Sequence, residues 1–272
     1  MKRIRKRYFP FLKAGMQTLI AYRMNFLGFV IGGLVYCFVM FYLWRAVFTS
    51  SGGDRFLGFT MTEMVLFLFL SNAATQLTFS SVSGDIGEEI KDGSICMRLI
   101  KPVDTDWSYL WNELGGALLK LLVFLLPMVV GLEIYRTCIT GQFLFSPVHF
   151  LLFLLSLILA YLISFRINLC FGFVAFYVKN LWGFNILKNS IIHFLSGSLI
   201  PLAFMPSVLR LILEYLPFAS MSYTPVMIYL CKYSPQEIAL RMGIQVFWII
   251  AMFGLSKLVW RGAIRKLSVQ GG

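Results

Sequence analysis

Long uncharged apolar runs constrain this sequence more than any other feature. Four of them approach or exceed the roughly 20 residues that a helix needs to cross about 30 Å of hydrocarbon. Their apolar residues are continuous rather than alternating, so helices, and not the strands of a membrane β-barrel, would satisfy the backbone hydrogen bonds. The four runs are Phe26–Trp44, Met64–Gly84, Phe143–Phe165 and Asn189–Leu209.

Two further runs tolerate a charge inside or at an end. Leu114–Leu132 contains Lys120, and Arg241–Trp260 is apolar between Arg241 and Lys257. The composition agrees, because 59% hydrophobic and only 13% charged residues give more apolar surface than a soluble core could hide. We therefore predict an all-α integral membrane protein with six transmembrane helices.

The basic residues indicate how these helices are oriented. Lys and Arg number 24 against 12 Asp and Glu, and they concentrate before the first run and around the last. Short segments rich in Lys and Arg stay in the cytoplasm, so both termini are predicted to be cytoplasmic. Anionic lipid at the bilayer surface explains such charge, and we expect the lipid bilayer rather than nucleic acid as its partner.

Two amphipathic or broken segments flank the spans. Pro10 is placed to open a helix over residues 10–24 that lies in the membrane interface, an elbow before the first span. Near the other end, the apolar segment Ser196–Leu240 is interrupted by five prolines. Broken helices at membrane depth must be buried in protein or line a cavity, so residues 201–238 are interpreted as external re-entrant helices before the last span.

The densest charge lies in Gly84–Trp107, between the second and third spans. Acidic residues come first and cations mostly follow, with glycines between them. We predict a short helix over Asp85–Lys91, stopped by Gly93, with its acids in the first turn where the helix dipole favours them. From the residues alone, this segment is either a solvated connector or a contact surface for a partner.

Two stretches resemble a known family. Glu89–Ile95 (EIKDGSI) followed by Leu99–Pro102 (LIKP) resembles the segment after the second span in permeases of type-2 ABC exporters. Ser196–Pro206 (SGSLIPLAFMP) followed by Leu216–Phe218 (LPF) is similar to the external re-entrant region of the same permeases. The resemblance covers nearly the whole chain, and the order and spacing of the motifs carry it.

The resemblance implies a function for the charged segment. In this family the segment after the second span is a coupling helix that docks on a cytoplasmic ATPase, and Ile86 and Ile90, four residues apart, would be its buried anchor. Charges around such a contact chiefly set register and partner choice. The residues expected to couple to the ATPase are Asp85, Ile86, Glu88, Glu89, Ile90, Asp92 and Gly93.

The resemblance also implies partners and a location. Two copies of a cytoplasmic ABC ATPase would bind ATP and Mg²⁺, since this chain has no G-x-x-x-x-G-K-[ST] motif and needs no cofactor of its own. A second permease chain, identical or related, would complete the translocation path. The expected setting is a bacterial cytoplasmic membrane, and the expected cargo is amphipathic or lipid-like, a peptide or a drug.

Polar residues within the spans are candidates for the translocation path. A charge at the bilayer centre costs about 2.5–3.5 kcal/mol, so Arg166 needs a partner, water or a route to the surface. Whether Arg166 is structural or functional stays open, and polar packing between helices is an equal alternative for the others. The candidates are Glu63, Asn72, Gln76, Arg166 and Asn168.

Two other functional classes fit less well. An ion-coupled carrier or channel is expected to show rings of charge or matched broken helices, and neither is evident. A membrane-embedded lipid-modifying enzyme needs a nucleophile and a base, yet no G-x-S-x-G motif occurs. The five cysteines lack metal-ligand spacing, and a pairing of Cys138 with Cys231 on predicted external segments stays open.

The six-span topology predicts where reporter fusions will appear. Fusions within 84–107, within 179–188 and at the C-terminus are expected in the cytoplasm, because these segments lie on the same side as the basic N-terminus. Fusions at Ser51, Gln142 and Tyr233 are expected outside. A paired phosphatase and fluorescent-protein reporter series measures this, and an external C-terminus would contradict the topology.

Overall fold

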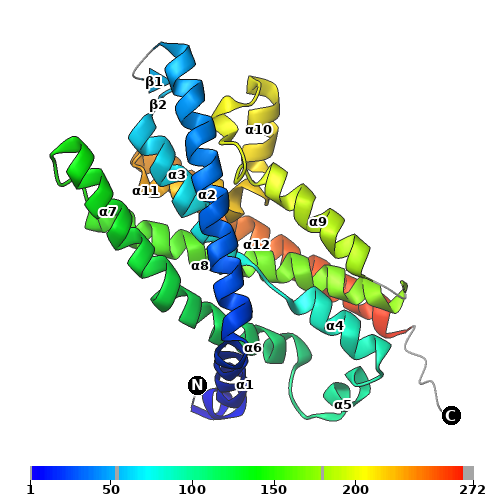
Figure 1. Cartoon of the computed structure of the whole chain (residues 1–272). Helices are drawn as coiled ribbons and strands as arrows, with labels where there is room; N and C mark the ends of the chain where they lie inside the picture. Colours follow the sequence, from blue (N-terminus) through cyan, green and yellow to red (C-terminus); the bar gives the residue numbers. More distant parts are fainter. Residues whose placement is uncertain (1, 53–54, 179–180, 266–272) are drawn as a thin grey trace.

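The computed structural model describes residues 2–52, 55–178 and 181–265. Within them the chain is helical apart from one two-stranded hairpin and the connecting turns (Figure 1). The first half comprises α1 (Lys2–Ala21), α2 (Arg23–Ser51), β1 (Arg55–Phe56), β2 (Phe59–Thr60), α3 (Met61–Thr78), α4 (Val82–Lys91), α5 (Ile95–Ile100) and α6 (Thr105–Lys120). The second half comprises a π-helical turn η1 (Leu121–Leu125), α7 (Leu126–Thr140), α8 (Pro147–Phe173), α9 (Trp182–Leu195), α10 (Ser207–Tyr215), α11 (Tyr223–Tyr229), α12 (Pro235–Ile264) and the 3₁₀ turns η2 (Val174–Phe176), η3 (Leu202–Phe204) and η4 (Ala219–Met221).

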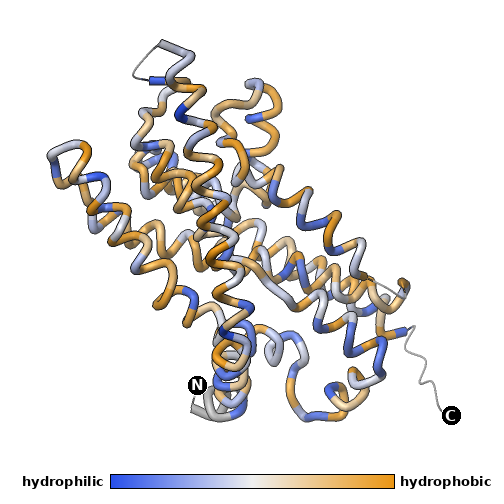
Figure 2. Tube along the Cα trace, viewed as in Figure 1, coloured by the Kyte–Doolittle hydropathy of each residue, from blue (hydrophilic) through white to orange (hydrophobic). Residues whose placement is uncertain are grey.

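Several helices match the predicted membrane spans. Five helical stretches among the described residues are long and apolar enough to cross a membrane. They correspond to five of the six predicted runs, and Figure 2 shows apolar residues along them and polar residues gathered around α4 and α5. The all-α multi-pass membrane fold is confirmed. The stretches are α2, Met61–Lys91, Thr105–Thr140, Pro147–Phe176 and α12.

The predicted run Asn189–Leu209 is not one helix. α9 ends at Leu195, and the next residues turn through Gly197, whose φ of +72° lies in the left-handed region. A Cβ at Gly197 would lie 2.9 Å from Leu202 Cγ, so the turn requires glycine. Pro201 and Pro206 then prevent the helix from resuming before α10. With 14 residues, α9 is about 21 Å long, shorter than the hydrocarbon layer.

The second predicted run also ends early. α3 stops at Thr78, Phe79 is extended with φ −61° and ψ 127°, and a new helix, α4, begins at Val82. The Asp85–Lys91 helix is therefore confirmed but starts three residues sooner than predicted. It lies along α8 rather than projecting freely, as Figure 1 shows. A Cβ at Gly172 of α8 would lie 2.8 Å from Ile86 Cδ1, so glycine permits this close approach.

The N-terminal helix differs in extent and in packing from the predicted elbow over residues 10–24. α1 begins at Lys2 and contains Pro10 in its interior, so Pro10 does not open the helix. α1 also packs tightly on α6 rather than resting on lipid alone. A Cβ at Gly15 would lie 1.7 Å from the carbonyl oxygen of Asn112, and one at Gly115 would lie 2.1 Å from that of Leu12. The two backbones thus touch where both helices lack side chains.

The third span changes helix type where proline interrupts it. Pro127 lacks an N–H and would clash with the carbonyl four residues earlier in a regular α-helix. The chain widens into the π-helical turn η1 just before it, with Leu126 N–H bonded to the Leu121 carbonyl. The stretch from α6 to α7 thereby stays continuous across this position.

α3 forms the centre of the fold. Of the apolar 18-residue part of Met61–Lys91, 67% is buried inside the fold, against 6% of the corresponding part of α2 and 11% of that of α12. Phe67, Leu70 and Phe153 are completely enclosed in the largest apolar cluster, together with Tyr223 of α11. α2 and α12 therefore present most of their surface to lipid or to another chain.

The helices run between two ends of the molecule. In Figure 1, α1, α4 and α5 lie at one end, which we call the α4–α5 end, and α12 finishes on that side. The β1–β2 hairpin and α10 lie at the opposite end, which we call the hairpin end. Residues 53–54, 179–180 and 266–272, which include part of the predicted cytoplasmic segment 179–188 and the C-terminus, lie outside the described residues.

The α1–α6 contact predicts a sharp response to substitution. Gly15→Val places a branched side chain on the Asn112 carbonyl, and overpacking of this kind costs about 1–3 kcal/mol. We expect a melting temperature in detergent lowered by roughly 2–10 °C, read by tryptophan fluorescence. Gly28→Ala on α2, where a Cβ meets nothing within 4 Å, is the control. Equal stability of both variants would contradict the close packing.

Candidate functional site

The charged segment Gly84–Trp107 folds as α4, a turn, α5 and the first turn of α6. Gly93 makes the turn with a φ of +79°, which confirms the predicted helix stop. Asp92 Oδ1 accepts a hydrogen bond from Ser94 N–H at 2.8 Å. Hydrogen bonding by Ser94 lowers the pKa of Asp92, so this exposed carboxylate stays charged and fixes the turn.

One face of α4 is buried inside the chain. Val82 and Ile86 have no exposed surface, and Ile86 packs with Tyr109, Phe165 and other residues of α6 and α8. Ile90 is half-buried against the same cluster. Ile86 therefore offers no surface to a partner, which corrects its expected place as an external anchor. The i, i+4 spacing identified an internal contact instead.

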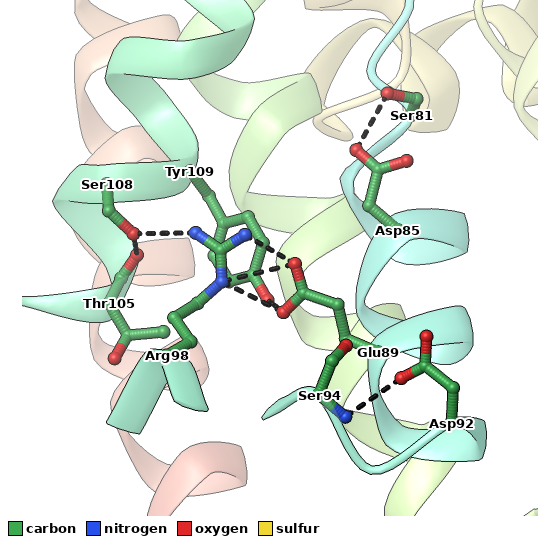
Figure 3. A network of polar contacts seen from close by, with 9 residues as sticks. All are labelled: Ser81, Asp85, Glu89, Asp92, Ser94, Arg98, Thr105, Ser108 and Tyr109. Atoms are coloured by element: carbon green, nitrogen blue, oxygen red, sulfur yellow. Dashed lines mark hydrogen bonds and ion pairs between the residues drawn. The ribbon is translucent and has the colours of Figure 1, made fainter. Parts of the chain in front are cut away.

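A second face of α4 holds α5 and α6 in place. Glu89 forms a bidentate ion pair with Arg98, whose Nε lies 2.8 Å from Oε2, and also accepts a hydrogen bond from the Tyr109 hydroxyl (Figure 3). Arg98 stacks 4.0 Å from the centre of the Tyr109 ring and donates to Ser108 Oγ at 3.1 Å. Bidentate charged pairs are among the stronger protein hydrogen bonds. Glu89 thus holds α5 and α6 against α4.

The residues that remain exposed lie mostly at the tip. Glu88, Lys91 and Asp92 are exposed on α4 and its end. On α5, which contacts α4, Met97 and Ile100 are 67% and 78% exposed. Large apolar side chains flanked by charges are typical of protein contact surfaces. We call these five residues the tip surface.

Asp85 points away from the tip surface. It accepts a hydrogen bond from Ser81 Oγ at 3.1 Å, as Figure 3 shows, and lines a cavity between α1, α2 and α6. Gln76 lines the same cavity, and its Nε2 lies 3.5 Å from the Phe29 carbonyl oxygen. The structure therefore brings together one residue expected to couple to the ATPase and one expected on the path.

Asn168 belongs to a buried polar network that the sequence did not indicate. Lys188 of α9 donates to Asn168 Oδ1 and, at 3.0 Å each, to Ser83 Oγ and Asn185 Oδ1. Lys188 is only 5% exposed and has no ion-pair partner among the described residues. Its charge is satisfied by three neutral oxygens. The network joins α4, α8 and α9.

Arg166 has a partner in the structure. Its Nη1 lies 3.2 Å from Asp106 Oδ2 at the start of α6, and Lys257 of α12 lies 3.2 Å from the same oxygen. The guanidinium also lies 4.6 Å from the centre of the Phe253 ring. Arg166 and Asp106 are both buried. This cluster ties α6, α8 and α12 and gives Arg166 a structural reason for its position.

Two of the path candidates lie in helix contacts instead of a shared passage. Glu63 completes a capping box with Thr60 and pairs with Lys232 at 2.7 Å near the hairpin end. Asn72 packs against Gly33 of α2, where a Cβ would lie 2.7 Å from its Oδ1. The five candidates are therefore spread over separate sites in this chain. The Thr60-x-x-Glu63 spacing was a readable capping signal.

The comparison with known families settles the class of protein. The family described as ABC-2 family transporter protein matches residues 34–271. The chain belongs to the ABC-2 transporter family. A search of curated proteins returned no match. The resemblance carried by the charged segment and the re-entrant motifs is thus confirmed. This family forms the membrane permease of ABC transporters, a transport component that generally works with a separate ATPase subunit.

The Glu89–Arg98 ion pair predicts that substitutions at Glu89 and at its neighbour Glu88 have different effects on stability. Glu89→Gln removes the charge that holds Arg98, at a cost of about 1–3 kcal/mol. We expect faster hydrogen exchange across α4 and α5. Glu88→Gln changes an exposed side chain, and its effect should stay within about 0.5 kcal/mol. Indistinguishable hydrogen exchange in the two variants would contradict this structural role of Glu89.

Proposed function

We propose that this permease is the membrane-spanning subunit of an ATP-driven exporter in a bacterial cytoplasmic membrane, with its α4–α5 end in the cytoplasm. The family membership and the multi-pass fold support this, as does the concentration of Lys and Arg before α2 and around the end of α12. With α9 as a short additional crossing between the end of α8 and α10, six crossings return the chain to its starting side. α1 is the elbow, and the segment 201–238 is external and re-entrant.

The observation that carries the ATPase contact is the tip surface. Met97 and Ile100 are apolar, exposed and three residues apart on α5, and Glu88, Lys91 and Asp92 are exposed charged residues on the neighbouring α4 and its end. Apolar anchors inside a charged rim are the arrangement that protein docking favours. We propose that α5 inserts these two side chains into a groove of the ATPase. The proposed apolar anchor is therefore the Met97 and Ile100 pair of α5, in place of Ile86 and Ile90.

Contacts between the tip-surface helices and the membrane helices allow a motion of the tip surface to reach the membrane helices. Glu89 and Arg98 join α5 to α4, Ile86 locks α4 on α8, and Lys188 joins α4 to α9. A displacement of the tip would thus reach α8 and α9 through packed or hydrogen-bonded contacts. We propose that closure of two ATPase copies, driven by ATP with Mg²⁺, is transmitted along this route to a path completed by a second permease.

The docking proposal is tested by removing the apolar anchor. Met97→Ser with Ile100→Ser leaves every hydrogen bond of the segment in place, and loss of such anchors weakens binding by about 2 kcal/mol or more, roughly thirtyfold. We expect the double variant to insert normally but to lose its ATPase on co-purification. The measurement is ATPase retained per permease after gel filtration.

The matched control replaces an equally exposed apolar residue elsewhere. Phe143, in the loop between α7 and α8, is 73% exposed and far along the chain from the tip surface. Phe143→Ser should retain the ATPase. If the Met97 and Ile100 double variant keeps its ATPase and hydrolyses ATP at the rate of the unaltered complex, α5 is not the docking element.

A further inference from the structure

A cavity of about 310 Å³ lies beside the break between α3 and α4. α1 and α2 form one wall, with Tyr22 between them, and α6 forms the other. Phe26 and Phe29 of α2 and Phe79 of the break give it an apolar lining. Its volume is that of a small-molecule pocket.

The polar end of the cavity carries two carboxylates. Asp85 and Glu113 both line it, and neither forms an ion pair with any residue that the structure describes. Glu113 Oε1 accepts a hydrogen bond from Ser81 Oγ at 3.2 Å, and the buried hydroxyls of Ser80 and Tyr161 also lie against this carboxylate. These hydroxyls are neutral and supply no counter-ion for the carboxylate, which is costly at a buried position.

Lys120 forms no ion pair with either carboxylate. Lys120 lines the cavity, but it lies two turns beyond Glu113 on α6, about 10 Å along the helix axis. Its Nζ contacts the Gln76 carbonyl oxygen at 3.4 Å and the Phe79 ring at 5.7 Å from the centre. Lys120 would therefore repel a ligand's positive charge from the far end and favour it at the carboxylates.

We propose that this cavity binds an amphipathic organic cation. Its ammonium group lies between Asp85 and Glu113, and its apolar body lies along Phe26, Phe29 and Phe79, whose ring faces also attract cations. The proposal rests on the proposed transport function and deepens it, because it names amphipathic amines as the class of cargo. The site is built within one permease chain.

Three fluorescent probes with the same body test the charge requirement. Dansylcadaverine carries an ammonium group, its N-acetyl derivative is neutral, and dansyl-aminohexanoate carries a carboxylate. We expect the chain in lipid nanodiscs to bind the ammonium probe at least about tenfold more tightly than the other two. Fluorescence anisotropy measures this, with empty nanodiscs subtracted.

Two kinds of variant then locate the site. Asp85→Asn with Glu113→Gln keeps the shapes but removes both charges, and should weaken the ammonium probe at least about tenfold without affecting the neutral one. Gly116→Phe fills the cavity, since a Cβ there meets nothing within 4 Å, and should abolish binding of the ammonium probe. Glu237→Gln removes an exposed acid at the start of α12 and preserves its cap, so it should bind normally.

Three outcomes would overturn the proposal: no binding of the ammonium probe, equal binding of the neutral probe, or unaltered binding by the Asp85 and Glu113 double variant. Thermal unfolding of each variant shows whether it is folded. The assay uses the permease without its ATPase. Loss of probe binding in a chain that still co-purifies with its ATPase would therefore defeat this inference and leave the proposed function standing.

Discussion

The contact between α4 and α8 is the interaction on which the α4–α5 end depends. Ile86 fits against Gly172 so closely that any side chain at 172 would displace it. Burial of one such isoleucine contributes about 1.5–3 kcal/mol. Once this contact fixes α4, its other faces are determined: Glu89 meets Arg98, Ser83 meets Lys188, and Asp85 turns into the cavity. The ten residues of α4 thereby contact α5, α6, α8 and α9.

This placement explains why a chain so poor in charge concentrates it here. A buried or half-buried charge at the α4–α5 end is tolerated where a second helix supplies the partner, as Asp106 does for Arg166 and Glu89 for Arg98. These pairs hold α6, α8 and α12 or α4, α5 and α6 in register. The charges left over, on Glu88, Lys91 and Asp92, lie on the exposed tip. Structural and contact functions are thus divided between neighbouring positions of one short segment.

The fold was predictable wherever a local signal was strong. Continuous apolar runs located five spans, and the acidic first turn with Gly93 located α4. The early ends of the runs Met64–Gly84 and Asn189–Leu209 were not predicted. In the first, Leu77–Val82 contains no proline or glycine, and in the second, the apolar residues around Gly197 outweighed its turn signal. Partners such as Arg166 and Asp106, 60 residues apart, depend on how helices pack, which one sequence does not specify. Glu113 and Lys188 were missed for the same reason.

Charges without counter-ions carry the most functional information. Placing a charge at membrane depth costs about 2.5–3.5 kcal/mol, and a pair within the chain offsets that cost. Lys188 does without a counter-ion because three oxygens saturate its three N–H donors, so it has no capacity left for a ligand. Glu113 differs, since it forms no ion pair with any described residue and lines a cavity large enough for a ligand. The same physical rule therefore assigns Lys188 to the framework that joins α4, α8 and α9, and Glu113 to ligand binding.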